Sequence, residues 1–305
     1  MRVRLVPRRA RSTLFILMKR IFVTSCAAAA SNHTCMALAN ANLGPIPFED
    51  LSRGHARAGK GRPLIQEHLR YRHAGDHAIA EVLPLIEMFF TAYSYVGSSV
   101  AEPSIYLRSY FPRTLNLLDF IRWHSAGCRG RSDTCDTSGR SEKLPLTEGY
   151  PQRTIYSFGE LELIAEGACA DCTVAHGLRA VSHRYFNAMG ADAIGKFGER
   201  HYRETQLIPL VLADAQWGLP VTVYGDDHNT PDRTCIREDV HVSHLSKAHI
   251  HVLQSLRQSE KSAAKRVTGV GDGTKFIDDG QWGIWLRDIC AIIDRSSRLL
   301  RTDYA

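Results

Sequence analysis

The sequence predicts an α/β fold in which one large domain is followed by a smaller one. Three observations lead to this prediction. The chain has 305 residues, which is long enough for both domains. Residues 19–24 are basic at their start and then apolar, a pattern typical of a buried strand. Ser25 and the alanines after it can begin a helix directly behind this strand, with Ser25 as the N-cap residue.

The composition is that of an ordinary globular protein, with 44% hydrophobic and 23% charged residues. The formal net charge is +6, but five arginines lie ahead of Met18, and without those five the charge is +1. We therefore expect no basic surface for nucleic acid. The apolar run Leu14–Met18 is too short to span a membrane, so no membrane partner is expected either.

Residues 1–17 are set apart from the rest of the chain. Because the first strand begins directly after Met18, this segment is either an over-extended start or an arginine-rich targeting segment. We favour the mis-set start and expect the first domain to begin at residue 18.

No metal site is expected. The eight cysteines lack framework spacing, and the one Cys-x-x-Cys pair, Cys169 and Cys172, falls within an expected helix. Two unpaired thiols in a reducing cytoplasm explain this pair better than zinc or redox chemistry does. Four histidines cluster between residues 241 and 251, but no additional acid or cysteine completes a ligand set.

The most informative part of the chain lies between His176 and Gln254, where short motifs follow one another in a fixed order. They are Arg184-Tyr185-Phe186-Asn187, Gly198-Glu199-Arg200-His201, Leu207–Leu212, Val223–Asp227, Thr230-Pro231-Asp232, Thr234–Arg237 and Val240-His241-Val242. In this order and at these spacings the run resembles UDP-glucose 4-epimerases, which belong to the extended short-chain dehydrogenase/reductase family.

The resemblance implies a Rossmann-type, doubly wound parallel sheet that binds NAD, over residues 18–185. Residues 186–305 would complete this sheet and form a small domain for the UDP-sugar. The resemblance fades after Thr274, so we expect this second domain to be truncated. The implied activity is the interconversion of UDP-glucose and UDP-galactose through an NAD-bound 4-keto intermediate, in galactose metabolism in the cytoplasm. A homodimer is one possible assembly.

The expected cofactor positions are substituted. Ser25, Ala28 and Ser31 occupy the three positions of the family's G-x-x-G-x-x-G turn, and each added β-carbon should weaken the contact with the pyrophosphate. Glu49 stands where an acid would meet the adenosine ribose. His68 replaces an aspartate near the adenine.

Further cofactor contacts are expected from Tyr185 and from the segment before the helix that begins at Thr114. In that segment Tyr110 replaces a cofactor-facing asparagine, and Pro112 should mark a break or a first-turn position. The family's fifth strand, between Gly127 and Arg140, carries two arginines and a glycine, which are unfavourable in a buried strand unless paired.

The catalytic residues of the family are replaced as well. Such epimerases use Tyr-x-x-x-Lys on a helix, in which the tyrosine takes a proton from the sugar 4-hydroxyl and the lysine lowers the phenol pKa. Counting back from Arg184, these positions are Phe158 and Glu162. Thr134 matches a hydroxyl that binds the reacting sugar, and Tyr156 would face the opposite side of the helix.

On the substrate side, Asn187, Leu207 and Arg237 match the family's contacts with the UDP-sugar. A guanidinium such as that of Arg237 suits a diphosphate, although a surface ion pair is an equally ordinary use of an arginine.

Three hypotheses for function follow. The chain is a UDP-glucose 4-epimerase, a catalytically inactive relative that binds a nucleotide sugar or a partner, or a decayed copy that does not fold stably. Because the glycines and the catalytic pair are lost, we expect no epimerase activity.

Overall fold

The computed structural model describes the chain from Arg20 to Trp285, with gaps. The described residues are 20–26, 28–51, 64–66, 86–89, 96–123, 128–134, 139, 150–196, 198–199, 204–223, 225–231, 233–234, 236–237, 239–258, 266–269 and 284–285.

A seven-stranded parallel sheet forms the centre of the described residues. Its strands are β1 (Arg20–Thr24), β2 (Gly44–Glu49), β3 (Ile65–Gln66), β4 (Ile86–Phe89), β5 (Cys128–Thr134), β6 (Arg179–Tyr185) and β10 (Arg266–Gly269). They lie in the order β10-β6-β5-β4-β1-β2-β3, and every neighbouring pair is parallel. From β3 to β6 this is the strand order of a Rossmann fold, so the predicted fold class is confirmed.

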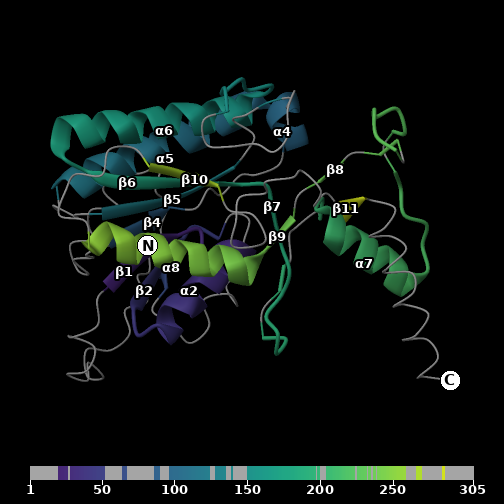
Figure 1. The fold of residues 1–305 in the computed structure, drawn as a ribbon, viewed down its shortest axis with the longest axis horizontal. Helices are drawn as coiled ribbons and strands as arrows, with labels where there is room; N and C mark the ends of the chain where they lie inside the picture. The colour runs from purple at the N-terminus through teal and green to yellow at the C-terminus, as the bar shows by residue number, and fades with distance from the viewer. Residues whose placement is uncertain are drawn as a thin grey trace.

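Helices cover both faces of this sheet (Figure 1). Helices α2 (Ala29–Asn40) and α8 (Val242–Gln258) pack on one face, while α5 (Pro103–Trp123) and α6 (Ser157–His176) pack on the other. The short helix α4 (Val96–Ala101) lies beside α5 and α6.

Strand β1 shows why the sheet needs both helical layers. Its residues alternate between the faces: Ile21 and Val23 pack in a cluster with α2 and α8, whereas Phe22 packs in a second cluster with α5 and α6. All three side chains are fully buried. A continuous apolar run of this kind is typical of a parallel strand that is covered on both sides.

The remaining elements form a smaller part of the molecule beside the large sheet (Figure 1). Strand β7 (Asn187–Met189) pairs with β9 (Asp239–His241) in parallel, and β8 (Ile236–Arg237) pairs with β11 (Ile284–Trp285) in the antiparallel sense. Helix α7 (Leu207–Trp217) accompanies them.

Ser25 is not a helix cap, contrary to our prediction. Helix α2 begins three residues later than expected, and its N-cap residue is Ala28, which makes no side-chain cap hydrogen bond. Ser25 instead takes a left-handed conformation with φ 53°. The chain must turn sharply here between strand and helix, and this conformation costs a non-glycine residue about 1–2 kcal/mol.

Pro112 does not break a helix, so this prediction was also wrong. Helix α5 runs through it without interruption, from Pro103 to Trp123. Buried side chains before and after the proline, including Tyr110 and Leu117, hold both halves against the core. Pro112 has no N–H to donate to the carbonyl of Arg108, which belongs to an exposed residue.

The segment expected to be unfavourable as a strand does form β5. On one side it pairs with β4. On the other side it pairs with β6 over its whole length, in a register that opposes Arg129 to Ala180 and Arg131 to Ser182. The side chains of β5 lie outside the described ones.

Two histidines are buried against each other between β6 and α8. The rings of His183 and His249 have centroids 4.5 Å apart, and each residue is only 1% exposed. Burial lowers the pKa of His249 to about 4. Burial, and then the nearby His249, lower the pKa of His183 well below its ordinary value.

We predict that this pair destabilises the fold in acid. In the unfolded chain both imidazoles have a pKa near 6.5, so between pH 6.5 and 4 the unfolded state binds protons that the folded state does not. Stability should be complete above pH 6.5 and fall as the pH drops, by about 3 kcal/mol for His249 alone. Urea denaturation at pH 7.5, 6 and 5 measures this dependence.

The matched controls lie on the same helix. His249→Leu should make the pH dependence less steep, with the part due to the buried His183 remaining, whereas replacing the exposed His251 with Gln should leave it unchanged. An equally steep dependence in His249→Leu and the unaltered protein would contradict the assignment.

Candidate functional site

Several of the predicted site residues lie at the carboxyl ends of the strands of the large sheet. In a parallel sheet with this strand order, ligands bind beyond the carboxyl ends of the strands, where the order reverses between β1 and β4. Ser25 follows the end of β1, and Glu49 is the last residue of β2. Thr134 and Tyr185 end β5 and β6 and oppose each other in register.

The turn after β1 is held by hydrogen bonds within the turn itself. The backbone N–H of Ala28 donates to the carbonyl of Ser25 at 3.1 Å. The hydroxyl of Ser31 donates to the same carbonyl and to that of Ala28, the latter at 3.1 Å. Ser31 is fully buried, so its side chain is accommodated inside the protein, while Ala28 is half-buried. The substitution at the third glycine position therefore braces the turn.

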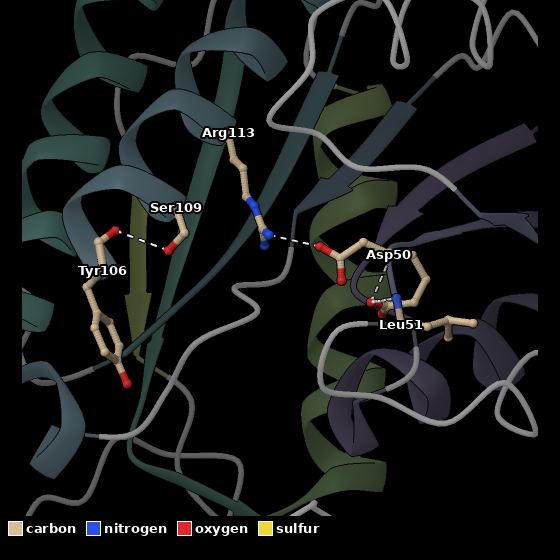
Figure 2. Close-up of polar contacts among 6 residues, drawn as sticks. Asp50, Leu51, Tyr106, Ser109 and Arg113 are labelled. Carbon is tan, nitrogen blue, oxygen red and sulfur yellow. Dashed lines mark hydrogen bonds and ion pairs between the residues drawn. The ribbon is translucent and has the colours of Figure 1, made fainter. Parts of the chain in front are cut away.

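Glu49 is buried at the end of β2 and bonds to the loop that follows it. Its Oε1 atom accepts the backbone N–H groups of Asp50 at 3.1 Å and Leu51 at 3.2 Å. Asp50 in turn pairs with Arg113 of α5 at 2.8 Å (Figure 2). The predicted adenine contact, His68, lies outside the described residues.

Phe158, which we predicted to stand at the position of a catalytic tyrosine, lies inside an aromatic cluster. Phe158, in the first turn of α6, is 2% exposed. The rings of Tyr106 and Tyr110 meet it edge-on, each with its centroid 6.3 Å from that of Phe158. Leu161 and Ala165 complete this buried cluster. Tyr110, at the family's cofactor-facing asparagine position, thus packs against Phe158.

Glu162 follows Phe158 by one helical turn and is fully buried. Glu166 follows one turn later on the same face. Its two carboxylate oxygens accept bonds from Nε and Nη2 of Arg184 on β6, at 2.7 and 2.6 Å. This buried bidentate pair fixes the register of α6 against the sheet. Tyr156 is the N-cap residue of α6 and lies outside the helix proper.

The predicted substrate residues lie in the smaller part of the molecule. Asn187 begins β7 and opposes Asp239 of β9. Leu207 begins α7, and Arg237 ends β8, which pairs with β11. The structure describes only the backbone of Arg237 and of Thr134, so the orientation of these two side chains remains a prediction.

One site feature escaped the analysis of the sequence. Arg113 and Asp50 are 63 residues apart in the chain, and nothing in their local patterns links them. The segment that holds Arg113 was singled out in the sequence only for Tyr110 and Pro112.

Within the described residues, no group of His, Cys, Asp and Glu side chains is arranged to hold a metal ion. In the same part of the chain, no helix is long and apolar enough to cross a bilayer.

The strand order, together with helices on both faces of the sheet, places the chain in the class of Rossmann-type α/β proteins. Residues 27–267 match the model of the NAD dependent epimerase/dehydratase family, and the chain belongs to this family.

Its relatives include UDP-glucose 4-epimerases. The chain is 35% identical over 256 residues to that of Rhizobium leguminosarum bv. trifolii, a match that covers 83% of this chain and 78% of the relative. It is 33% identical over 262 residues to that of Halalkalibacterium halodurans, with 84% and 76% covered. Among solved structures, UDP-glucose 4-epimerase from Brucella ovis in complex with NAD is similar, with a TM-score of 0.83 and 34% identity over 91% of this chain and 82% of that one.

Proposed function

We propose that this chain is a non-epimerising member of its family that binds a UDP-sugar and, more weakly than its relatives, NAD. The observation that carries the proposal is the packing of Phe158. At the position of the family's general base stands a side chain without an exchangeable proton, buried against Tyr106 and Tyr110.

The neighbouring substitution acts in the same direction. A lysine one turn after the tyrosine would lower the phenol pKa by its charge, whereas Glu162 offers a carboxylate at that place. We expect that Tyr156, which is the N-cap residue of α6, does not replace the lost phenol. General acid–base catalysis contributes about 10²–10⁴-fold to such reactions, so its loss should suppress epimerisation strongly.

The residues at the sheet edge fit a dinucleotide in part. Glu49 stands at the end of β2, where an acid binds the adenosine ribose, and the turn after β1 leads into the N-terminus of α2, which suits a pyrophosphate. NAD, when bound, accepts a hydride from the sugar. Ser31 is contained within the turn, so the half-buried Ala28 is the substitution that should weaken the pyrophosphate contact most.

Support for the UDP-sugar comes from the retained motifs of the second half. By the resemblance described above, Asn187, Leu207 and Arg237 match contacts with the UDP-sugar, and the relatives named above are UDP-glucose 4-epimerases. Thr134 and Tyr185, opposed at the ends of β5 and β6, would border the sugar and the cofactor.

We predict that the purified protein binds UDP, measured by isothermal titration calorimetry, but does not convert UDP-galactose to UDP-glucose. Its turnover should lie at least about 10²-fold below that of an active relative assayed alongside. The double substitution Phe158→Tyr and Glu162→Lys should not restore turnover, because Ala28 remains in the turn and a lysine would have to occupy a fully buried position.

Turnover close to that of the active relative would contradict the proposal. An aggregated protein that binds no UDP would favour the decayed copy instead.

We predict that Ala28→Gly strengthens NAD binding, because it removes the β-carbon that faces the pyrophosphate. The expected gain is about tenfold in Kd, equivalent to about 1.4 kcal/mol. Ser31→Gly is the matched control: it should bring no such gain, since the Ser31 hydroxyl holds the carbonyls of Ser25 and Ala28. Titration of each variant with NAD, followed by protein fluorescence, measures both. An equal gain in NAD affinity from the two substitutions would contradict the view that the buried Ser31 does not weaken NAD binding.

We further propose that two copies pair through α5 and α6. Leu107, Phe111 and Leu115 follow one another at four-residue intervals on α5 and are 50%, 37% and 41% exposed, and Ile164 of α6 is 42% exposed. An exposed apolar stripe of this kind is typical of a helix that packs on a partner.

Light scattering after size exclusion should therefore give a dimer for the unaltered protein and a monomer for Leu115→Glu. Val174→Glu, at a position 89% exposed near the end of α6, should remain dimeric. A monomeric unaltered protein at micromolar concentration would rule this interface out.

A further inference from the structure

Two cysteine thiols contact each other where the turn after β1 meets α2. The Sγ atoms of Cys26, in that turn, and Cys35, in α2, lie 3.2 Å apart. Cys26 is 3% exposed, Cys35 is fully buried, and both are free thiols. Apolar side chains of β1, α2, β6 and α8 form the same core cluster: Ile21, Val23, Leu38, Val181 and Leu253. The pair is therefore enclosed in the core, although one member belongs to a turn.

Hydrogen bonds hold the two sulfur atoms in this position. Ser25 takes a left-handed conformation, and Cys26, the next residue, places its side chain in the core. The thiol of Cys26 donates to the carbonyl of Val23 at 3.0 Å. Because a thiol has a single hydrogen, the thiol of Cys35 is then the donor between the two sulfurs. Packing alone does not require such a contact between sulfur atoms, since a free cysteine packs as a small apolar side chain.

This arrangement favours a particular chemistry. The S–S bond of a disulfide is about 2 Å long, so the sulfurs need to approach by only about 1 Å once their hydrogens are lost. Burial, and then the hydrogen bond with Cys35, raise the pKa of the Cys26 thiol well above its ordinary value. The reactive thiolate is therefore rare while the turn is closed. Once one sulfur is oxidised, the other is already in contact with it, which favours disulfide closure over further oxidation.

We propose that Cys26 and Cys35 form a reversible dithiol–disulfide couple, which hydrogen peroxide oxidises and small thiols reduce. In the first step one thiol becomes a sulfenic acid, while the O–O bond of the peroxide breaks and one water is released. In the second step the other thiol attacks the sulfenic sulfur, so that the S–S bond forms, the S–O bond breaks and the oxygen leaves as a second water. The two thiols lose two electrons and two protons in total, and the peroxide takes up both.

The disulfide fastens the turn after β1 to α2. In the reduced protein the hydroxyl of Ser31 holds this turn by hydrogen bonds to the carbonyls of Ser25 and Ala28. A covalent link restricts the unfolded chain as well, so the oxidised protein should resist urea more than the reduced one. The same turn is where the proposed function places the pyrophosphate, but the couple does not depend on cofactor binding.

Trypsin makes the test direct. It cuts after Arg20 and Arg53 and leaves residues 21–53 as one peptide, in which Cys26 and Cys35 are the only cysteines. The folded protein is treated with hydrogen peroxide, denatured and alkylated, and the peptide is weighed. We expect it to be unalkylated and lighter by two hydrogen atoms. Treatment of the oxidised protein with dithiothreitol should restore two alkylated cysteines in this peptide.

Two variants separate the couple from general oxidation. Cys35→Ser removes the second sulfur, so its peptide should not lose two hydrogens, and its urea midpoint should be the same before and after peroxide. Cys169→Ser is the matched control, because Cys169 is also 3% exposed but lies on α6. It should form the disulfide and show the same rise in urea midpoint as the unaltered protein. Circular dichroism shows whether each variant is folded, and Cys26→Ala supplies the same test if Cys35→Ser is not.

Two free thiols in the peptide of residues 21–53, in a sample whose other cysteines have reacted, would overturn the proposal. Oxidation of Cys26 or Cys35 to a sulfinic acid without a cross-link would overturn it as well, and so would a disulfide from either residue to a different cysteine. Titration of the reduced protein with UDP tests the proposed function separately, because neither cysteine has a part in binding the UDP-sugar there.

Discussion

The register of α6 against β6 determines what this site can do. The buried bidentate pair of Glu166 and Arg184 joins the helix to the sheet at two hydrogen bonds of 2.7 and 2.6 Å. With Glu166 held there, Glu162 and Phe158 lie one and two turns earlier on the same buried face. The ring of Phe158 is thereby set between Tyr106 and Tyr110. By our prediction this is the position at which an epimerase carries a proton-exchanging phenol, and in this chain the side chain there packs in the core.

The turn after β1 is likewise held by contacts within the protein. A residue with a side chain, Ser25, takes the left-handed conformation that glycine adopts at little cost. The strain is offset locally, because the hydroxyl of Ser31 binds two carbonyls of the turn. The chain thus turns from strand to helix with side chains at all three positions where we predicted substituted glycines. The turn can keep its shape while its affinity for NAD falls, and Ala28 is the position at which we expect this loss of affinity.

The fold class could be predicted from the sequence because two patterns in it are strong. The buried strand at residues 19–24 and the ordered motifs after His176 led to a parallel sheet of the observed strand order. Predictions from local sequence patterns were wrong where contacts between residues far apart in the chain determine the structure. Ser25 was predicted to cap a helix, but it lies in the turn before α2. Pro112 was predicted to break a helix, but α5 continues through it because buried side chains on both sides hold the helix against the core.

The ion pair of Arg113 and Asp50 shows the same limit most clearly. It joins the loop after β2 to helix α5, 63 residues further along the chain, and only the folded sheet brings these two residues together. The positions of Phe158 and Glu162, by contrast, followed from counting along one helix and one strand. The chemical roles of the candidate site residues remain predictions that depend on ligands.

The central claim is that no group at position 158 accepts the proton whose loss accompanies hydride transfer from the sugar. Rapid mixing of the protein with saturating NAD and UDP-glucose, followed at 340 nm where reduced nicotinamide absorbs, tests this step directly. We predict no rise in absorbance while calorimetry on the same sample confirms that both ligands are bound. A rise that requires both protein and UDP-glucose would show that hydride transfer still occurs, and would contradict the assignment of residue 158 to packing alone.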